Sequence, residues 1–349
     1  MNDQKISQRA LKLLSCIEWC GEFPVRLLDK LSGCYDYNRR LITKSVRHGY
    51  LRERVLQDCD RHVVRSLSLT ASGRALLRRS GLDGPWDTLP PLAPRDGCGN
   101  REKTLRLHRQ AVLFVLARRL SAVWLPLPEK DSFLGRQLVY YSSYELCRRF
   151  GWDSKGARLS GVFFTDHLRC FPVYYLGNHN MRWNENAECY FRNRILAQFA
   201  LLPIRLEADI LIGERWELAA ELVKYGSRKH TRLIPTDRGM SHCFSASDEN
   251  GLKLLRLLLY ESENERFLRY LWQCCQIWLP VEHYFLYLDE LTAMYRSDRH
   301  GEWHDRHDHF YFDFQEPVLR QLCAQGLPDR FYPGSWLDES RILSRQPRL

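Results

Sequence analysis

The spacing of apolar residues changes once within residues 1–80, and this change constrains the fold more than any other feature of the sequence. Up to Gly49, apolar residues recur at helical spacing in three segments, residues 7–21, 25–31 and 35–49. After Gly49 they alternate in two short runs, Leu51–Gln57 and His62–Leu69, which residues 58–61 connect. Two alternating runs with a short polar connection predict a β-hairpin.

A further helix is predicted directly after the hairpin. Thr70 can cap this helix, which covers Ala71–Arg79 before Gly, Pro and Asp become frequent. Three helices, a hairpin and a fourth helix form the element order that is typical of a winged helix-turn-helix domain. The sequence therefore predicts such a domain at residues 1–80.

The excess of positive charge lies in this same part of the chain. The whole sequence has 52 Lys and Arg against 42 Asp and Glu, which leaves a net charge of +10. Residues 1–80 contain 16 of the basic and 8 of the acidic residues, so they carry +8, and the remaining 269 residues carry only +2. A basic domain with this element order predicts double-stranded DNA as its partner.

The predicted third helix carries a stripe of cations. Arg40, Lys44 and Arg47 are spaced i, i+4 and i+7, so they share one helix face that can enter a major groove. Arginine can bind guanine through two hydrogen bonds, asparagine can read adenine, and other cations neutralise phosphates. The simpler alternative is a solvated helix face without a partner. The predicted DNA contacts are Asn38, Arg39, Arg40, Thr43, Lys44 and Arg47 on the helix and Arg52, Arg54, Arg61, His62 and Arg65 on the hairpin.

The rest of the chain is expected to form a linker, a second domain and an extension, which makes the fold class α+β. Residues 81–101 are rich in Pro and Gly and indicate a linker, residues 102–290 a mixed α/β domain, and residues 291–349 a His-rich loop, an aromatic strand and a C-terminal extension. The predicted strands are Trp124–Leu127, Gly161–Thr165, Cys170–Leu176, Ala208–Ile212, residues near 231–235, His242–Ala246, Trp278–Leu288 and Phe310–Phe314. The predicted helices are Leu105–Val123, Tyr144–Phe150, Asn186–Leu201, Glu214–Lys224 and two helices within Leu252–Ile277.

Motifs for phosphate binding and hydrolysis are absent from the sequence. GxxxxGK[ST], GxGxxG, GxSxG and HExxH do not occur. A restriction-like nuclease needs an Asp on one strand and Glu-x-Lys on the next, and Glu-x-Lys does not occur either. The weak candidates for a metal-binding catalytic set are Glu207 and Asp209 at the start of a strand and Glu188 before them; the alternative is ordinary carboxylates at a strand edge.

Metal sites have equally weak support. His300, His304, His307 and His309 lie in a short polar tract and can ligate a metal if one face collects them, although a Gly-containing tract favours an exposed loop. The 12 cysteines form no CxxC pair, so they predict reduced thiols rather than zinc ligands. We expect no cofactor.

A membrane partner is not expected. The most apolar stretch, Ala111–Val123, is interrupted by Arg118 and Arg119 and is shorter than the about 20 residues that a membrane span requires. The first residues, Met1–Arg9, are polar and resemble no signal segment. We therefore expect a cytoplasmic protein.

Several segments within roughly residues 8–260 resemble those of a known family. They are Leu67-Ser-Leu-Thr-Ala-Ser-Gly73, the helix Thr104–Val123, Tyr141-Ser-Ser-Tyr-Glu-Leu, Gly161-Val-Phe-Phe, Val173-Tyr-Tyr and Met181-Arg-Trp-Asn. Through them the chain resembles the replication-relaxation family of proteins that conjugative plasmids and integrated elements encode. That family combines a DNA-binding winged helix with a nuclease-like α/β domain, so the resemblance implies a nuclease-like second domain, here degenerate.

These observations lead to one expected function and two alternatives. We expect a double-stranded DNA-binding accessory or regulatory protein of a mobile element, acting in replication, relaxation or transfer control. Its second domain would form a homodimer or contact a relaxase or a replication protein. The alternatives are a metal-dependent nuclease and a transcription repressor whose α/β domain senses a ligand.

Overall fold

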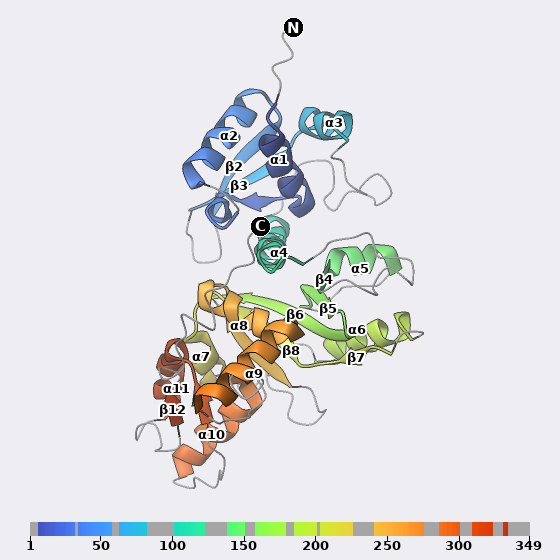
Figure 1. The fold of residues 1–349 in the computed structure, drawn as a ribbon. Helices are drawn as coiled ribbons and strands as arrows, with labels where there is room; N and C mark the ends of the chain where they lie inside the picture. The colour runs from blue at the N-terminus through green and yellow to red at the C-terminus, as the bar shows by residue number, and fades with distance from the viewer. Residues whose placement is uncertain are drawn as a thin grey trace. The chain divides into compact units, whose positions relative to one another are not determined.

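The computed structural model divides the chain into two units, and each is described by itself (Figure 1). The first unit contains Met1–Arg119 and Ser142–Trp152, and the second contains most of the remainder. The structure describes residues 6–31, 34–57, 63–81, 101–122, 138–150, 158–178, 185–200, 203–225, 241–275, 286–300, 309–323 and 331–333.

The first 80 residues fold into the elements that the spacing of apolar residues predicts. The order is α1 (Gln8–Cys20), β1 (Phe23–Pro24), the 3-10 helix η1 (Val25–Leu28), α2 (Tyr35–Arg47), β2 (Leu51–Gln57), β3 (Val63–Leu69) and α3 (Ala71–Arg79). The three strands form an antiparallel sheet in the order β1-β3-β2. The predicted hairpin and its flanking helices are thus confirmed, and β1 is a short strand that the sequence did not indicate.

Local capping explains where these helices begin. The Ser7 side chain accepts a hydrogen bond from Ala10 N at the start of α1, and the Thr70 side chain accepts one from Gly73 N at the start of α3. The Thr70 hydroxyl also donates to the Gly49 carbonyl. A Cβ at Gly73 would lie 2.2 Å from the Tyr50 carbonyl oxygen, so α3 packs against the start of the hairpin more closely than any side chain at this position permits. This contact gives the segment Leu67–Gly73 a structural role.

Helix α4 (Arg101–Arg119) belongs to the first unit, whereas the sequence placed it in the second domain. It packs against α1 and β1, and the rings of Trp19 and Phe114 lie 5.7 Å apart. The linker at 82–100 lies outside the described residues. Its composition suggested a domain boundary, but the contacts of α4 are made with residues far earlier in the chain, which composition does not reveal.

A buried polar cluster, formed by Glu22, Arg54, Ser66 and His108, joins α4 to the small sheet. The Ser66 hydroxyl donates to Glu22 Oε2 over 2.6 Å, and His108 Nε2 lies 2.8 Å from the same hydroxyl. Because the hydroxyl donates to Glu22, His108 is the donor in the second bond and carries its proton on Nε2. Arg54 forms an ion pair with Glu22.

Helix α5 (Ser143–Phe150) completes the described part of the first unit. Ser142 and Glu145 form a capping box, in which Ser142 N donates to Glu145 Oε2 over 2.7 Å and Glu145 N donates to Ser142 Oγ over 3.3 Å. The helix contacts α4 through Gln110, which donates to Ser143 Oγ over 3.1 Å. The run that begins at Tyr141 therefore encodes a helix start.

The second unit is built on a mixed sheet, so the chain as a whole is α+β. The strand order is β10-β9-β8-β6-β5-β4, and β7 pairs with β6. Strand β8 lies between β6 and β9, is parallel to both, and is buried along its whole length. The strands are β4 (Leu138–Ser142), β5 (Gly161–Thr165), β6 (Arg169–Gly177), β7 (Arg205–Leu206), β8 (Asp209–Gly213), β9 (His242–Ala246) and β10 (Leu286–Tyr287).

The sequence prediction of this sheet is confirmed for its central strands. Strands β5 and β6 form the predicted antiparallel hairpin around Asp166 and His167. The predicted strands Trp124–Leu127 and near 231–235 lie outside the described residues. The helices are α6 (Glu185–Gln198), α7 (Leu218–Tyr225), α8 (Glu249–Leu259), α9 (Glu261–Cys275), α10 (Leu288–His300) and α11 (Glu316–Leu322).

Two predictions near the C-terminus differ from the structure. Helix α10 continues across residue 291, where the sequence placed the start of a loop. The predicted strand Phe310–Phe314 is a strand only at β11 (His309–Tyr311), which pairs with β12 (Phe331–Pro333), and Asp313–Gln315 form a 3-10 helix, η4. Gln315 is buried and accepts a hydrogen bond from Phe312 N over 2.9 Å, which turns the chain.

The burial of His108 predicts a pH dependence of stability. Burial, assisted by Arg26 and Arg54, lowers the pKa of His108 from 6.5 to about 4. Unfolded His108 therefore binds a proton more readily than the folded residue, and stability falls as the pH falls from about 6.5 to about 4. The loss from this group amounts to about 3 kcal/mol, to be measured by urea unfolding across this pH range.

The matched variants are His108→Gln and His48→Gln. Glutamine at 108 keeps a donor for Ser66 but does not titrate, so this part of the pH dependence should disappear, whereas the exposed His48 should leave it in place. An unchanged pH profile in His108→Gln would contradict the role of His108.

Candidate nucleic-acid interface

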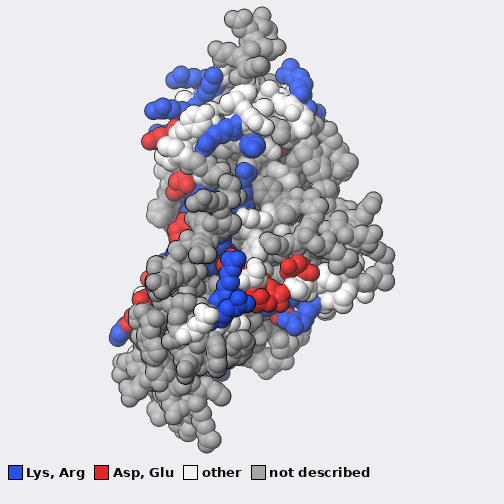
Figure 2. All heavy atoms as spheres, viewed as in Figure 1, with Lys and Arg blue, Asp and Glu red and all other residues white. Residues whose placement is uncertain are grey.

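Helix α2 has one buried face and one cationic face. Its buried residues are Asn38, Ile42 and Ser45. At about 100° per residue, Arg40, Lys44 and Arg47 fall within about 60° of one another on the opposite side. Figure 2 shows Lys and Arg side chains gathered over the part of the surface where α2 lies. The predicted stripe is thus on the solvent side of the helix.

The cations of this face are exposed. Arg39, Arg40, Lys44 and Arg47 are all exposed, and within the described residues none of the four forms an ion pair. Thr43 is also exposed, but its hydroxyl donates to the Arg39 carbonyl over 3.0 Å. Lys44 and Arg47 lie in the last turn, where the helix dipole favours positive charge. Arg39, Arg40, Thr43, Lys44 and Arg47 together form the surface called the α2 face.

Asn38 is not part of the α2 face, which corrects its expected role as a reader of adenine. Only 2% of its surface is exposed. Its Oδ1 accepts a hydrogen bond from Arg9 Nη2 over 3.2 Å, and its Nδ2 donates to the Leu28 carbonyl over 3.2 Å. Asn38 therefore joins α2 to α1 and to η1 and lies on the side of the helix opposite to the α2 face.

The hairpin offers fewer free cations than its sequence suggested. Arg52 is exposed, but Arg54 is three-quarters buried and forms an ion pair with Glu22. Arg65 is half exposed and forms an ion pair with Glu53 on the neighbouring strand. Arg61 and His62 lie outside the described residues. Of the hairpin cations described, Arg52 is thus the one best placed for a phosphate.

Two exposed tyrosines belong to the start of α2 and were missed at the level of sequence. Tyr35 and Tyr37 are 39% and 42% exposed. Tyr37 precedes Arg40 by three positions, so it borders the α2 face, and the Arg9 guanidinium lies 4.9 Å from its ring centre.

The second unit contains a different polar cluster, and it includes two of the predicted acids. Asp209 at the start of β8 and Glu188 on α6 are both fully buried. Arg192 forms an ion pair with Asp209, and His242 Nε2 lies 3.4 Å from Asp209 Oδ2. Glu188 Oε1 accepts a hydrogen bond from Arg158 N over 2.6 Å.

Burial controls the ionisation of these acids. It raises the pKa of Asp209 to about 7, while Arg192 opposes this shift and Glu188 adds to it. Burial likewise raises the pKa of Glu188 to about 7, and the hydrogen bond from Arg158 N opposes this shift. The two carboxyl groups are close enough to influence each other, but both are shielded from solvent and from a substrate.

The remaining candidates do not complete a catalytic set. Glu207 forms ion pairs with Arg169, over 3.1 Å, and with Arg205, so it faces these arginines. Within the described residues, no group of three or more His, Cys, Asp and Glu side chains is arranged to hold a metal. The side chains of His300, His304, His307 and His309 lie outside the described residues. The cluster around Asp209 is best understood as an internal ion network.

Comparison with known proteins found no similar one: no family model, no curated protein and no solved structure matches this chain. The resemblance to the replication-relaxation family accordingly stays a prediction from the sequence. Within the described residues, no helix is both long and apolar enough to cross a membrane.

The two paired arginines of the hairpin should differ in their effect on stability. Arg54→Ala leaves the buried Glu22 carboxylate without its cation and should cost about 3 kcal/mol, near the lower end for breaking a buried pair because Arg54 keeps some exposure. Arg65→Ala removes an exposed partner and should cost less than about 1 kcal/mol. Urea unfolding measures both, and equal losses would contradict this difference.

The network in the second unit leads to a prediction on Arg192. Arg192→Ala should destabilise the protein by about 3–5 kcal/mol near neutral pH, because Asp209 loses its buried partner. Without Arg192 the pKa of Asp209 rises further above its unfolded value, so folded Asp209 binds the proton more readily and the loss should grow as the pH rises.

The control for this experiment is Arg205→Ala. Arg205 is 70% exposed, so removing its pair with Glu207 should change stability by less than about 1 kcal/mol. Thermal unfolding at pH 5 and pH 8 measures both variants. A loss in Arg192→Ala that does not depend on pH would refute the proposed link to Asp209.

Proposed function

We propose that this protein binds double-stranded DNA through its first unit, which acts as a winged helix-turn-helix domain. In this proposal α2 is the recognition helix and the β2-β3 hairpin is the wing. The order of elements from α1 to α3 supports the assignment, since a helix, a short strand, a helical turn, a second helix and a hairpin follow one another.

The observation that carries the proposal is the α2 face. It presents Arg39, Arg40, Lys44 and Arg47 to solvent without an ion pair to a described carboxylate. A cluster of exposed, uncompensated cations on one helix is favourable when an anion faces it. The opposite side of α2 is fixed by Ile42 and by the hydrogen bonds of Asn38, so the cations have a defined direction.

The geometry suits the major groove. B-DNA offers a groove about 12 Å wide, which admits an α-helix. Residues near the start of α2, Tyr37 and Arg40, would then reach base edges, where arginine can bind guanine through two hydrogen bonds. Lys44 and Arg47, one and two turns further along, would contact phosphates and fix the register. Arg52 on the wing adds a further phosphate contact.

The biological role that we propose rests on the sequence resemblance. It is that of an accessory or regulatory protein of a plasmid or conjugative element, which controls replication, relaxation or transfer. The second unit would then provide a homodimer contact or a surface for a relaxase or replication protein. Selection of bound sites from a random DNA pool tests this role, because a palindrome indicates a dimer and a site beside the element's own origin indicates replication or transfer.

Removal of the stripe should weaken DNA binding in a salt-dependent way. In the combined variant Arg40→Ala, Lys44→Ala and Arg47→Ala, the plot of log K against log salt concentration should become shallower by about 1.8, since the phosphate contacts of Lys44 and Arg47 each contribute about 0.9. Loss of the base contact of Arg40 should relax the sequence preference at one position by about 1–3 kcal/mol. Fluorescence anisotropy at several salt concentrations measures both effects.

The matched control removes three exposed cations from the second unit. Arg194, Arg266 and Arg320 are exposed and lie on α6, α9 and α11, so their combined replacement by Ala changes the net charge equally. This variant should bind DNA as the original protein does. If both triple variants lose the same affinity, the charge of the whole protein and not the α2 face governs binding.

A further inference from the structure

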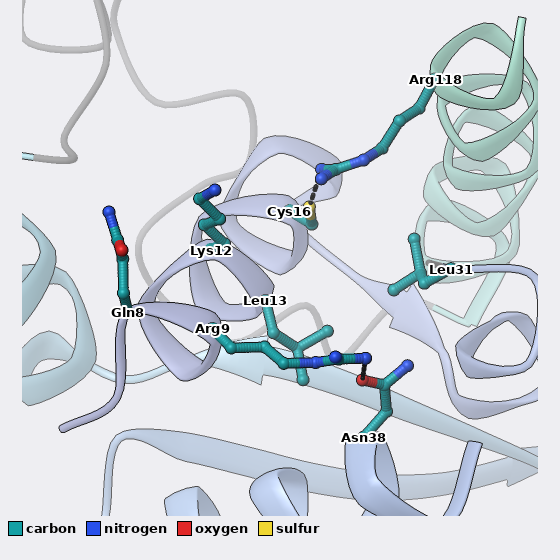
Figure 3. A pocket seen from close by; sticks show the side chains of 8 residues that line it. All are labelled: Gln8, Arg9, Lys12, Leu13, Cys16, Leu31, Asn38 and Arg118. Atoms are coloured by element: carbon teal, nitrogen blue, oxygen red, sulfur yellow. Dashed lines mark hydrogen bonds between the residues drawn. The ribbon is translucent and has the colours of Figure 1, made fainter. Parts of the chain in front are cut away.

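A pocket in the first unit lies between α1, α2 and α4 (Figure 3). Its volume is about 330 Å³, which is within the range of small-molecule sites. Its lining residues are Gln8, Arg9, Lys12, Leu13, Cys16, Leu31, Asn38 and Arg118.

The charge of the lining is entirely positive. Arg9, Lys12 and Arg118 are basic, and none of the eight lining residues is acidic. An anion that lies between these three side chains is attracted by all of them. The two guanidinium groups offer paired donors that match phosphate or carboxylate oxygens, and a total of three positive charges favours a dianion over a monoanion.

The structure holds two of these cations in place. Arg118 Nη1 donates to Cys16 Sγ over 2.7 Å, which directs the side chain of α4 toward α1. Arg9 Nη2 donates to Asn38 Oδ1 over 3.2 Å, and the Arg9 guanidinium lies 4.9 Å from the centre of the Tyr37 ring. In Figure 3 the Arg9 side chain extends from α1 toward Asn38, and the Arg118 side chain extends from α4 toward Cys16. The donors of both residues are therefore oriented before any ligand arrives, which reduces the entropy lost on binding.

The pocket is on the reverse side of α2 from the α2 face. Asn38 is the residue of α2 that lines it, and at about 100° per residue Arg40, Lys44 and Arg47 lie between about 180° and 240° around the helix from Asn38. A duplex bound on the α2 face therefore does not place its backbone in the pocket. This favours a small anion that diffuses in independently of DNA.

We propose that this pocket binds a small phosphate-bearing anion between Arg9, Lys12 and Arg118. Leu13 and Leu31 provide an apolar wall for a carbon skeleton attached to the phosphate. The site goes beyond the proposed DNA binding and does not depend on it, because ligand binding can be measured in the absence of DNA.

Calorimetric titration of the full chain with inorganic phosphate tests the proposal, with acetate at the same ionic strength as the control anion. Phosphate should bind and raise the unfolding temperature, and acetate should bind at least about tenfold more weakly. Lys12→Gln should weaken phosphate binding about fivefold, and Arg118→Gln at least as much. Lys12 is exposed, so its substitution does not disturb the core.

The control variant is Arg79→Gln, which removes an exposed cation of the same unit that does not line the pocket. It should bind phosphate as the original protein does. Equal binding of phosphate and acetate, no measurable phosphate binding, or identical phosphate affinities in Lys12→Gln and the original protein would each overturn the proposal.

Titration with duplex DNA distinguishes a free phosphate compound from a phosphate of the DNA backbone. If the ligand is a free anion, Lys12→Gln leaves the salt dependence of DNA binding unchanged. A slope that becomes shallower by about 0.9 would assign the pocket to the DNA backbone and overturn the free ligand. If the α2 face variants bind DNA as the original protein does, the proposed DNA binding is wrong but the calorimetric result with phosphate still stands. The two proposals can therefore be contradicted independently.

Discussion

The burial of the Glu22 carboxylate is the constraint on which the architecture of the first unit depends. Only 3% of Glu22 is exposed, and a buried carboxylate without partners is very unfavourable. Arg54 supplies the opposite charge from β2, and the Ser66 hydroxyl supplies a hydrogen bond from β3. His108 then bonds to Ser66 and so connects α4. One acidic group thus joins the segment before β1, both strands of the hairpin and a helix that begins more than 70 residues later.

The basic residues of the first unit have two different roles: some, like Arg54, pair with acids inside the structure, and others are exposed to solvent. The count of positive charge in residues 1–80 treats all arginines alike, but the structure divides them. Arg54 neutralises a buried acid, Arg65 pairs with Glu53, and the cations of the α2 face remain in solvent. The second unit repeats this use of arginine, since Arg192 neutralises the buried Asp209. Net charge alone therefore overstates the number of cations that are exposed and not paired with an acid.

Local signals allowed the elements of residues 1–80 to be predicted closely. Ser7, Gly49 and Thr70 mark helix ends through contacts within a few residues or with the adjoining segment, and the hairpin follows from alternation. The role of Asn38 could not be predicted in this way, because its partners Arg9 and Leu28 lie 29 and 10 positions away. The assignment of α4 to the first unit depends on contacts between residues that are even further apart in the sequence. In the second unit, the i, i+4 spacing of Glu188 and Arg192 was a usable signal that a cation accompanies the predicted acids.

The close contact of Gly73 with Tyr50 has a consequence for α2, the hairpin and α3. Tyr50 N donates to the Ser45 carbonyl of α2 and its own carbonyl accepts from Thr70 N, so one residue connects α2, the hairpin and α3. The absence of a side chain at 73 keeps these three elements at a fixed distance. The Gly-Tyr pair and the Thr-x-x-Gly motif about twenty residues later are therefore the sequence features that correspond to this contact. A substitution of Gly73 would therefore disturb α2 and the hairpin as well as α3.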